Sequence, residues 1–212
     1  MTQGHALGQL LAAADESFDP YAERILEAAR AELTEFGIRR TSLDDIAQSA
    51  GVGRATLFRR FPSRDALMAA VAAREARRAI SAVDRQVASV DDPVEFLVTG
   101  ALAAIREITG NDLLQRLLVT DRDLMLPLLS GKGAPILTMG SSYMAGQLER
   151  LRAQGAELAG DPEVVSELLA RLVLSLALNP EGVFPLDDEP QLEGVVRTNF
   201  VPMVLKPEKE HE

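Results

Sequence analysis

The chain has no cysteine, and this absence removes several kinds of chemistry at once. Without thiols there is no disulfide framework, no thiolate metal site and no cysteine nucleophile. The only histidines, His5 and His211, stand near the ends of the chain without a metal partner at helical or loop spacing. No serine occupies a nucleophile elbow. We therefore expect no metal, no cofactor and no catalytic residue, and we do not expect an enzyme.

Long apolar runs are also lacking. No stretch of about 18 apolar residues occurs, so no helix is predicted to span a membrane. The N-terminus has no basic leader and is not predicted to be a secretory signal. Hydrophobic residues still make up 47% of the 212 residues, enough for a sizeable core in one or two domains. The expected location is the cytoplasm.

Strand alternation and internal repeats are absent, whereas helix signals recur. Asp-Pro pairs at 19–20, 92–93 and 161–162 each precede a helical pattern, because aspartate accepts from free N–H groups and proline suits the first helical position. Gly37, Gly110 and Gly155 are expected stops. We predict an all-α fold with about nine helices, the clearest over 20–36, 54–60, 64–87, 93–109, 136–154, 162–178 and 192–205.

The most informative stretch, residues 41–67, predicts a helix-turn-helix. Two short helical patterns flank Gly51, and the small residue Ala47 stands four places before it. Two helices that cross steeply need a small side chain where they meet, and glycine tolerates the left-handed turn. The second pattern, 54–60, buries Leu57 and exposes residues that can reach phosphates and base edges, namely Arg54, Ala55, Thr56, Arg59 and Arg60.

The charge distribution agrees with this prediction. The whole chain carries a net charge of −10, which at first argues against nucleic acid. Residues 39–64, however, contain six arginines and two aspartates, a local charge of +4 that leaves −14 for the rest. Because salt screens charges beyond about 8 Å, a DNA phosphate responds mainly to the local +4.

The run from Leu57 to Leu67, LFRRFPSRDAL, resembles the TetR family of bacterial transcriptional regulators. The family signature is a helix-turn-helix followed by an aromatic run, a small polar residue, a basic residue and a long helix. The resemblance extends over residues 19–71. It departs at Gly53, where the family often has a serine or threonine cap, and at Phe58, where a tyrosine hydroxyl would reach phosphate. It implies that DNA is contacted by Arg40, Thr41, Gly53, Arg54, Ala55, Thr56, Phe58, Arg59, Arg60 and Arg64.

The resemblance also implies the organisation of the chain. We expect a flexible arm (1–18), a three-helix DNA-binding domain (19–65), a larger helical ligand-binding and dimerisation domain (66–205) and a disordered tail (206–212). The helix over 64–87 joins the two domains. The patterns after 162 and 192 are apolar on more than one face, which suggests a partner subunit. The predicted interface of the homodimer is Leu168, Leu172, Val196 and Phe200.

The implied function is that of a repressor that binds a palindromic double-stranded operator as a dimer and is released by a small, mainly apolar effector. The candidate pocket comprises Phe96, Met125, Leu128, Met139, Tyr143, Leu172 and Leu176, although each of these could also be ordinary core. A regulator without a ligand remains an alternative. A helical small-molecule carrier, an enzyme and a DNA-packaging protein are more remote ones.

Overall fold

The computed structural model describes residues 19–125 and 135–207, and the described chain is all-α as predicted. Within these residues the only β feature is one isolated bridge between Leu158 and Leu205. The expected arm (1–18), the segment 126–134 with Leu128, and most of the expected tail lie outside the described residues. No helix of the described residues is both long and apolar enough to cross a membrane.

The chain packs as two compact units, and the division differs from the boundaries expected from the sequence. Of the described residues, the first unit comprises those up to Arg78 and those within Asn111–Ile136, and the second comprises Ala79–Gly110 and those from Leu137 onward. The division therefore falls inside the long helix α5 (Arg64–Val87) rather than near residue 65. The segment that begins at Asn111 joins the first unit because α7 (Asp112–Thr120) packs on α2.

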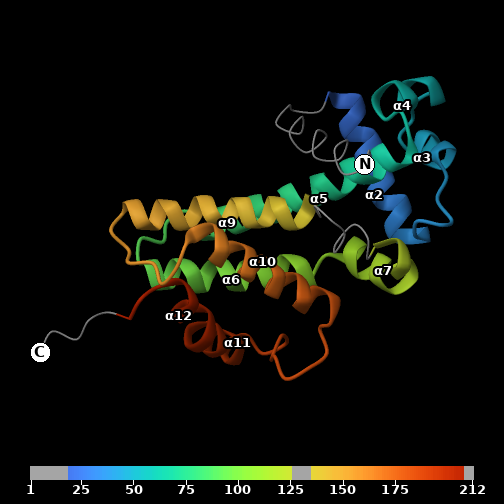
Figure 1. Ribbon diagram of the computed structural model, residues 1–212. Helices are drawn as coiled ribbons and strands as arrows, with labels where there is room; N and C mark the ends of the chain where they lie inside the picture. The colour runs from blue at the N-terminus through green and yellow to red at the C-terminus, as the bar shows by residue number, and fades with distance from the viewer. Residues whose placement is uncertain (1–18, 126–134, 208–212) are drawn as a thin grey trace, which may run out of the picture. The chain divides into compact units, whose positions relative to one another are not determined.

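The first unit is built around α2 (Pro20–Phe36), α3 (Leu43–Ser49) and α4 (Arg54–Arg60) (Figure 1). Asp19 caps α2 by accepting from the backbone N–H groups of Tyr21 and Ala22, and Gly37 ends the helix with a φ of 79°. The fully buried side chains of the first unit include Ile25, Leu26, Leu33, Ile46, Leu57 and Leu67. These are the apolar positions of the sequence pattern, so hydrophobic burial accounts for this unit.

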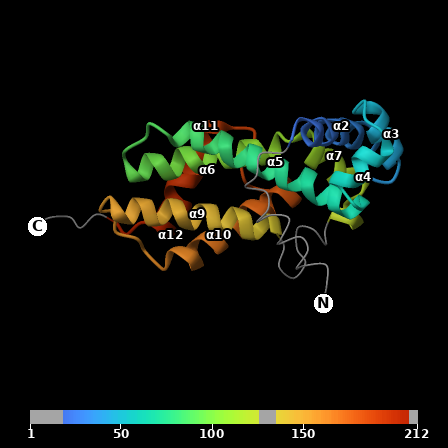
Figure 2. The same cartoon turned by 90° about the horizontal axis from the view of Figure 1, so that it is seen from above.

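The second unit surrounds α6 (Pro93–Thr109), which lies beside α10 (Pro162–Leu178), α11 (Glu189–Val195) and the π-helix η2 (Val196–Phe200) (Figure 2). The helix α9 (Pro135–Ala153) adds Leu148 and Leu151 to the core. The central cluster also contains Phe96, Leu102, Ile105, Leu169, Val196 and Phe200.

The last predicted helix, 192–205, is interrupted. Its sequence forms α11, η2 and α12 (Val201–Val204) in turn. Pro202 has no N–H to donate to the carbonyl of Thr198 four residues earlier, and the π-helix ends two residues before it at Phe200. A continuous apolar pattern thus produces an irregular helix because one proline removes a backbone donor.

Candidate nucleic-acid interface

The turn between α3 and α4 has the predicted geometry. Ala47 and Ala50 are buried, and Gly51 adopts a φ of 62°. The N–H of Val52 donates to the carbonyl of Ala47 at 3.0 Å, which closes the turn. Leu57, fully buried, holds α4 against the core, so the opposite face of α4 is left for solvent.

The exposed face of α4 presents basic and small side chains. Arg54, Ala55 and Arg59 are exposed, and Thr56 and Phe58 are half-buried. The guanidinium of Arg54 lies 5.4 Å from the centre of the Phe58 ring and donates to Asp44 at 2.8 Å. Arginine beside small residues suits the major groove, where guanidinium groups bind guanine edges or phosphates.

The N-terminal ends of the three helices around this face are capped differently. Ser42 caps α3 in a reciprocal capping box with Asp45. Ser63 accepts from the N–H of Ala66 at the start of α5, at 3.1 Å. Gly53 precedes α4 and offers no side-chain cap, and a Cβ added to it would meet no other atom within 4 Å. The N-terminus of α4 is therefore both uncapped and open.

Comparison with known proteins is consistent with this geometry. The family model of the bacterial regulatory proteins of the TetR family matches residues 25–71. An HTH-type transcriptional regulator of Mycobacterium tuberculosis (strain H37Rv) is 30% identical over 183 residues, which cover 86% of this chain and 85% of that protein. The chain belongs to the TetR family.

Two further relatives of this TetR-family protein carry a functional name. The HTH-type transcriptional regulator AlkX of M. tuberculosis is 30% identical over 175 residues, which cover 77% of this chain and 82% of AlkX. The crystal structure of the TetR-family repressor AlkX from a Dietzia strain, described as implicated in biodegradation of n-alkanes, superposes with a TM-score of 0.65. That superposition covers 85% of this chain and 98% of the other at 20% identity, and so it shows a shared fold.

Nine of the ten predicted DNA-binding residues of this TetR-family protein are exposed or half-buried, and only Thr41 is buried. All ten lie on the head, by which we mean residues 19–71. Seven of the nine are Arg40, Gly53, Arg54, Ala55, Thr56, Phe58 and Arg59, and the other two are Arg60 and Arg64. Some of these residues have partners within the protein, since the Arg54 guanidinium lies over the Phe58 ring and also pairs with Asp44.

The other three predicted residues are engaged within the protein. Thr41 is only 2% exposed, and its hydroxyl donates to the carbonyls of Gly37 and Glu32. Arg64 donates to the backbone carbonyl of Ile38. Arg60 is paired with Asp19, and its side chain is 16% exposed. These three side chains therefore bind backbone carbonyls or a carboxylate of the head.

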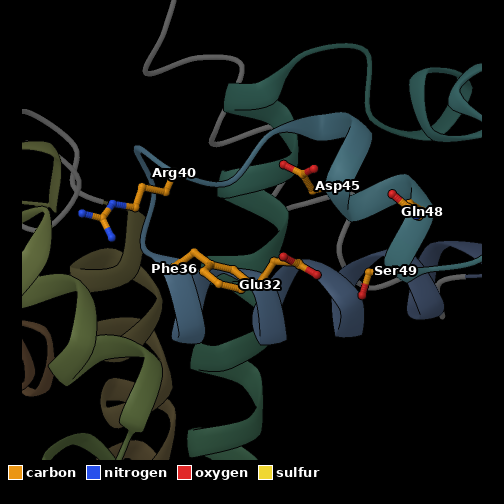
Figure 3. Close-up of a pocket in the computed structure, with 6 residues that line it drawn as sticks. All are labelled: Glu32, Phe36, Arg40, Asp45, Gln48 and Ser49. Carbon is orange, nitrogen blue, oxygen red and sulfur yellow. The ribbon is translucent and has the colours of Figure 1, made fainter.

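Arg40 also borders a shallow hollow of about 450 Å³ beside the helix-turn-helix (Figure 3). Glu32 and Phe36 of α2 line it, together with a set from α3, namely Asp45, Gln48 and Ser49. The hollow is open to solvent and carries two carboxylates. It therefore does not have the enclosed apolar character expected of an effector pocket.

The seven predicted pocket residues come from different parts of the chain. Phe96 is buried in the core of the second unit, and Met125 is buried in the first unit. Met139, Tyr143 and Leu176 are half-buried, and Leu172 is 38% exposed. Leu128 lies outside the described residues.

Tyr143 has a polar partner that the sequence did not identify. Its hydroxyl donates to Asp84 of α5 at 2.6 Å, and Gln147 donates to the same carboxylate at 3.3 Å. Burial and the hydrogen bond to Asp84 raise the pKa of the Tyr143 hydroxyl above its ordinary value. Tyr143 is thus a neutral hydrogen-bonding group in the second unit.

The predicted dimer residues separate into two groups. Leu168 and Leu172 are 49% and 38% exposed on α10, and Val164, which was not in the predicted set, is 59% exposed. Their four-residue spacing forms one apolar stripe. Val196 and Phe200 are instead 1% and 8% exposed, because they pack in the core of the second unit. The expected contribution of those two residues to an interface is therefore corrected.

Metal chemistry finds no support in the part of the chain that the structure describes. No group of three or more histidine, aspartate or glutamate side chains there could hold a metal ion. The carboxylates of the head instead cap helices or pair with arginines, as Asp19 and Asp45 do.

Proposed function

We propose that this TetR-family regulator is a repressor that binds a palindromic operator as a dimer and leaves it when a small, mainly apolar effector binds. The observation that supports DNA binding is the solvent-facing side of α4, where Arg54, Ala55 and Arg59 are exposed while Leu57 is buried. A short helix of this kind can enter a major groove and read a few base pairs.

The experiment is selection of bound fragments from genomic DNA, followed by binding of the selected site by α4 variants. Arg59→Ala should change base preference, at about 1–3 kcal/mol if the lost contact is bidentate. Arg85→Ala is a matched control, because Arg85 is an exposed arginine far along α5 from the helix-turn-helix. If both Arg54→Ala and Arg59→Ala prefer the same DNA sequence as wild type, the bases are not read by this face of α4.

The proposed dimer uses the apolar stripe of α10, defined by Val164, Leu168 and Leu172. Apolar side chains at three successive helical turns are unfavourable in water, and a second copy of the stripe would cover them. Two recognition helices related by a twofold axis could then meet successive major grooves about 34 Å apart. This accounts for the palindromic operator in the proposal.

The proposed effector is mainly apolar and carries at most one polar group. Support comes from the half-buried Met139, Tyr143 and Leu176 of the second unit, and from the relatives named AlkX, one of them implicated in n-alkane biodegradation. We propose an effector with a long alkyl chain, and Tyr143 as the hydrogen-bonding group.

The effector proposal is tested by titrating alkanes, fatty alcohols and fatty acids against the free protein and the operator complex. An inducer must bind the operator complex more weakly, by the same factor by which it weakens operator binding. Equal affinity in both states would exclude that compound as an inducer. If no compound binds the free protein, the regulator without a ligand becomes the better account.

A further inference from the structure

The first two turns of α2 contact both helices of the helix-turn-helix. Arg24 of α2 donates from Nη2 to the carbonyl oxygen of Ala50 at 2.6 Å and to that of Gly51 at 3.1 Å. The last carbonyls of a helix have no partner within the helix and carry its partial negative charge. Arg24 therefore satisfies the end of α3 and the turn that leads to α4.

The fit between Arg24 and the turn is close. A Cβ added to Gly51 would lie 2.9 Å from Nη2 of Arg24, nearer than carbon and nitrogen atoms normally approach. The glycine thus serves two purposes, because it permits the positive φ and leaves room for the guanidinium.

Arg60, in the last turn of α4, is held by the same part of α2. Its Nε lies 3.0 Å and 2.9 Å from the two carboxylate oxygens of Asp19. Its guanidinium carbon lies 4.9 Å from the centre of the Tyr21 ring, and that ring also lies 5.8 Å from the guanidinium carbon of Arg24. The Nη1 atom of Arg60 is covered and has no hydrogen-bond partner in the described part of the chain. A covered atom cannot meet a phosphate in this arrangement.

We propose that Asp19, Tyr21 and Arg24 form a clamp that sets the orientation of α4, and that Arg60 is a positioning residue that acts through this clamp rather than a DNA contact. This inference rests on the proposed reading of DNA by α4. The clamp joins residues far apart in the sequence, since Asp19 and Arg60 are separated by 41 positions.

A short recognition helix needs such a clamp for a geometric reason. The seven residues of α4 span about 10 Å, and Leu57 is its only buried side chain. No side chain caps its N-terminus at Gly53. A tilt of about 10° around Leu57 would move the ends of α4 by roughly 1 Å, which exceeds the tolerance of a preorganised binding site. Contacts at Arg60 and at the turn oppose this tilt from both ends of the helix.

The decisive variant is Asp19→Asn, because the loss of a negative charge and the loss of the clamp predict opposite changes in operator affinity. Asparagine caps a helix about as well as aspartate, so α2 keeps its N-cap. Removing a negative charge from the head should by itself strengthen DNA binding. Loss of the clamp should instead weaken operator binding, by about threefold or more. Asp65→Asn is the matched control, since Asp65 is exposed in the first turn of α5, and it should bind as tightly as wild type or more tightly.

A double-mutant cycle separates the clamp from a direct phosphate contact. Asp19→Asn and Arg60→Gln break the same pair, so their effects on operator affinity should not add. If Arg60 contacts phosphate, Arg60→Gln should lower the slope of log affinity against log salt by about 0.9. The clamp predicts a slope close to that of wild type. Circular dichroism melting of every variant shows that the head is folded in each measurement.

Arg24→Lys provides an independent readout that keeps the charge. A lysine lacks the planar fork that reaches two carbonyls, so the clamp predicts weaker operator binding with an unchanged salt slope. The clamp is overturned if Asp19→Asn and Arg24→Lys both bind the operator as tightly as wild type, or if Arg60→Gln loses about one unit of salt slope while Asp19→Asn is neutral. A wild-type protein that retains no DNA fragment would overturn the proposed function together with the clamp.

Discussion

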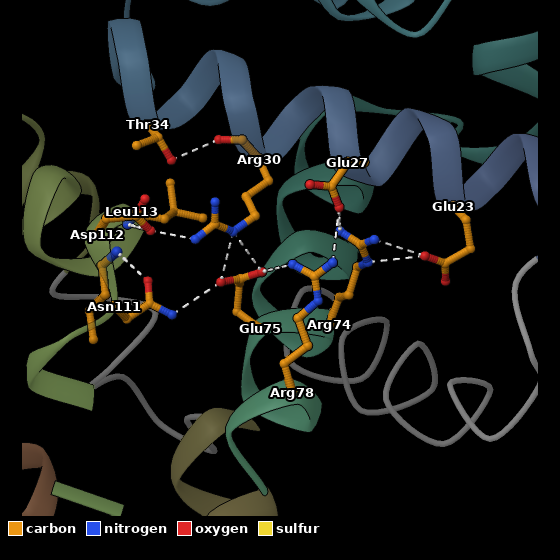
Figure 4. A network of polar contacts seen from close by, with 11 residues as sticks. Glu23, Glu27, Arg30, Thr34, Arg74, Glu75, Arg78, Asn111, Asp112 and Leu113 are labelled. Carbon is orange, nitrogen blue, oxygen red and sulfur yellow. Dashed lines mark hydrogen bonds and ion pairs between the residues drawn. The ribbon is translucent and has the colours of Figure 1, made fainter. Parts of the chain in front are cut away.

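The side-chain amide of Asn111 donates to Glu75 at 3.0 Å, at the point where the chain enters α7 (Figure 4). The amide oxygen of Asn111 meanwhile caps α7 by accepting from the N–H of Leu114. Glu75, on α5, also accepts from Arg30 of α2 at 3.3 Å and from Arg78 at 3.2 Å. One carboxylate, 13% exposed, therefore joins the three helices α2, α5 and α7 of the first unit.

Glu75→Gln should destabilise the first unit. The substitution leaves Arg30 and Arg78 without their shared carboxylate, and hydrogen bonds to charged groups contribute about 1.5–3 kcal/mol. The measurement is the free energy of unfolding from urea denaturation. Glu149→Gln is the control, because Glu149 forms an exposed pair with Arg152 and should change stability by less than about 1 kcal/mol. Equal effects of the two substitutions would contradict the central role of Glu75.

Gly53→Ser should stabilise α4. The position has an extended backbone and open space around a new Cβ, so a serine hydroxyl can cap the helix. Because glycine is itself a tolerable cap, the gain should be only a few tenths of a kcal/mol, measured by thermal unfolding. Gly53→Ala, which cannot cap, should not share this gain. A stabilisation of equal size in both variants would show that backbone entropy, not capping, is responsible.

Gly51→Ala should destabilise the helix-turn-helix, in contrast to changes at Gly53. The φ of 62° is unfavourable for alanine by about 1–2 kcal/mol, and the new Cβ would crowd Arg24. Chemical denaturation should therefore show a loss of at least about 1 kcal/mol. An unchanged denaturation midpoint would mean that the turn can relax without cost.

Leu168→Asp should shift the proposed dimer toward monomer. The substitution would bury a charge in the centre of the α10 stripe if two copies meet there. Sedimentation at micromolar concentration measures the outcome, and Val119→Asp is a control because Val119 is an 83% exposed apolar residue of α7. A wild-type protein that is monomeric yet binds its operator fully would rule out the proposed dimer.

Acid should weaken the first unit through Glu27. Hydrogen bonds from Arg74 and Arg78 hold the pKa of the Glu27 carboxyl below its ordinary value of 4.5. A carboxyl with a lowered folded-state pKa stabilises the fold above its unfolded pKa, and this contribution is lost as the pH falls through the folded value. Urea denaturation between about pH 6 and pH 3 should therefore show a smaller loss of stability in Glu27→Gln than in wild type. A larger acid-induced loss of stability in Glu27→Gln than in wild type would contradict the stabilising role of the Glu27 carboxylate.

Helix positions could be predicted from the sequence because their signals are local. The Asp-Pro pairs predicted the starts of α2, α6 and α10, and the predicted bounds of α4 and α5 agree with the structure. Each signal depends on residues within one or two turns, where capping and apolar spacing act directly. The exposed side of α4 followed in the same way from the position of Leu57.

Which side chains remain available on the surface could not be predicted in this way. Composition, periodicity and capping determined the all-α class and the helix-turn-helix, and the run from Leu57 to Leu67 carried the resemblance to the TetR family. Only the tertiary structure decided that Arg60 pairs with Asp19 and that Arg64 donates to the carbonyl of Ile38. It also decided that Phe200 is buried in the core while Leu168 lies on the surface. The reason is that these partners lie 26 or more positions apart in the sequence, so packing, and not local pattern, brings them together.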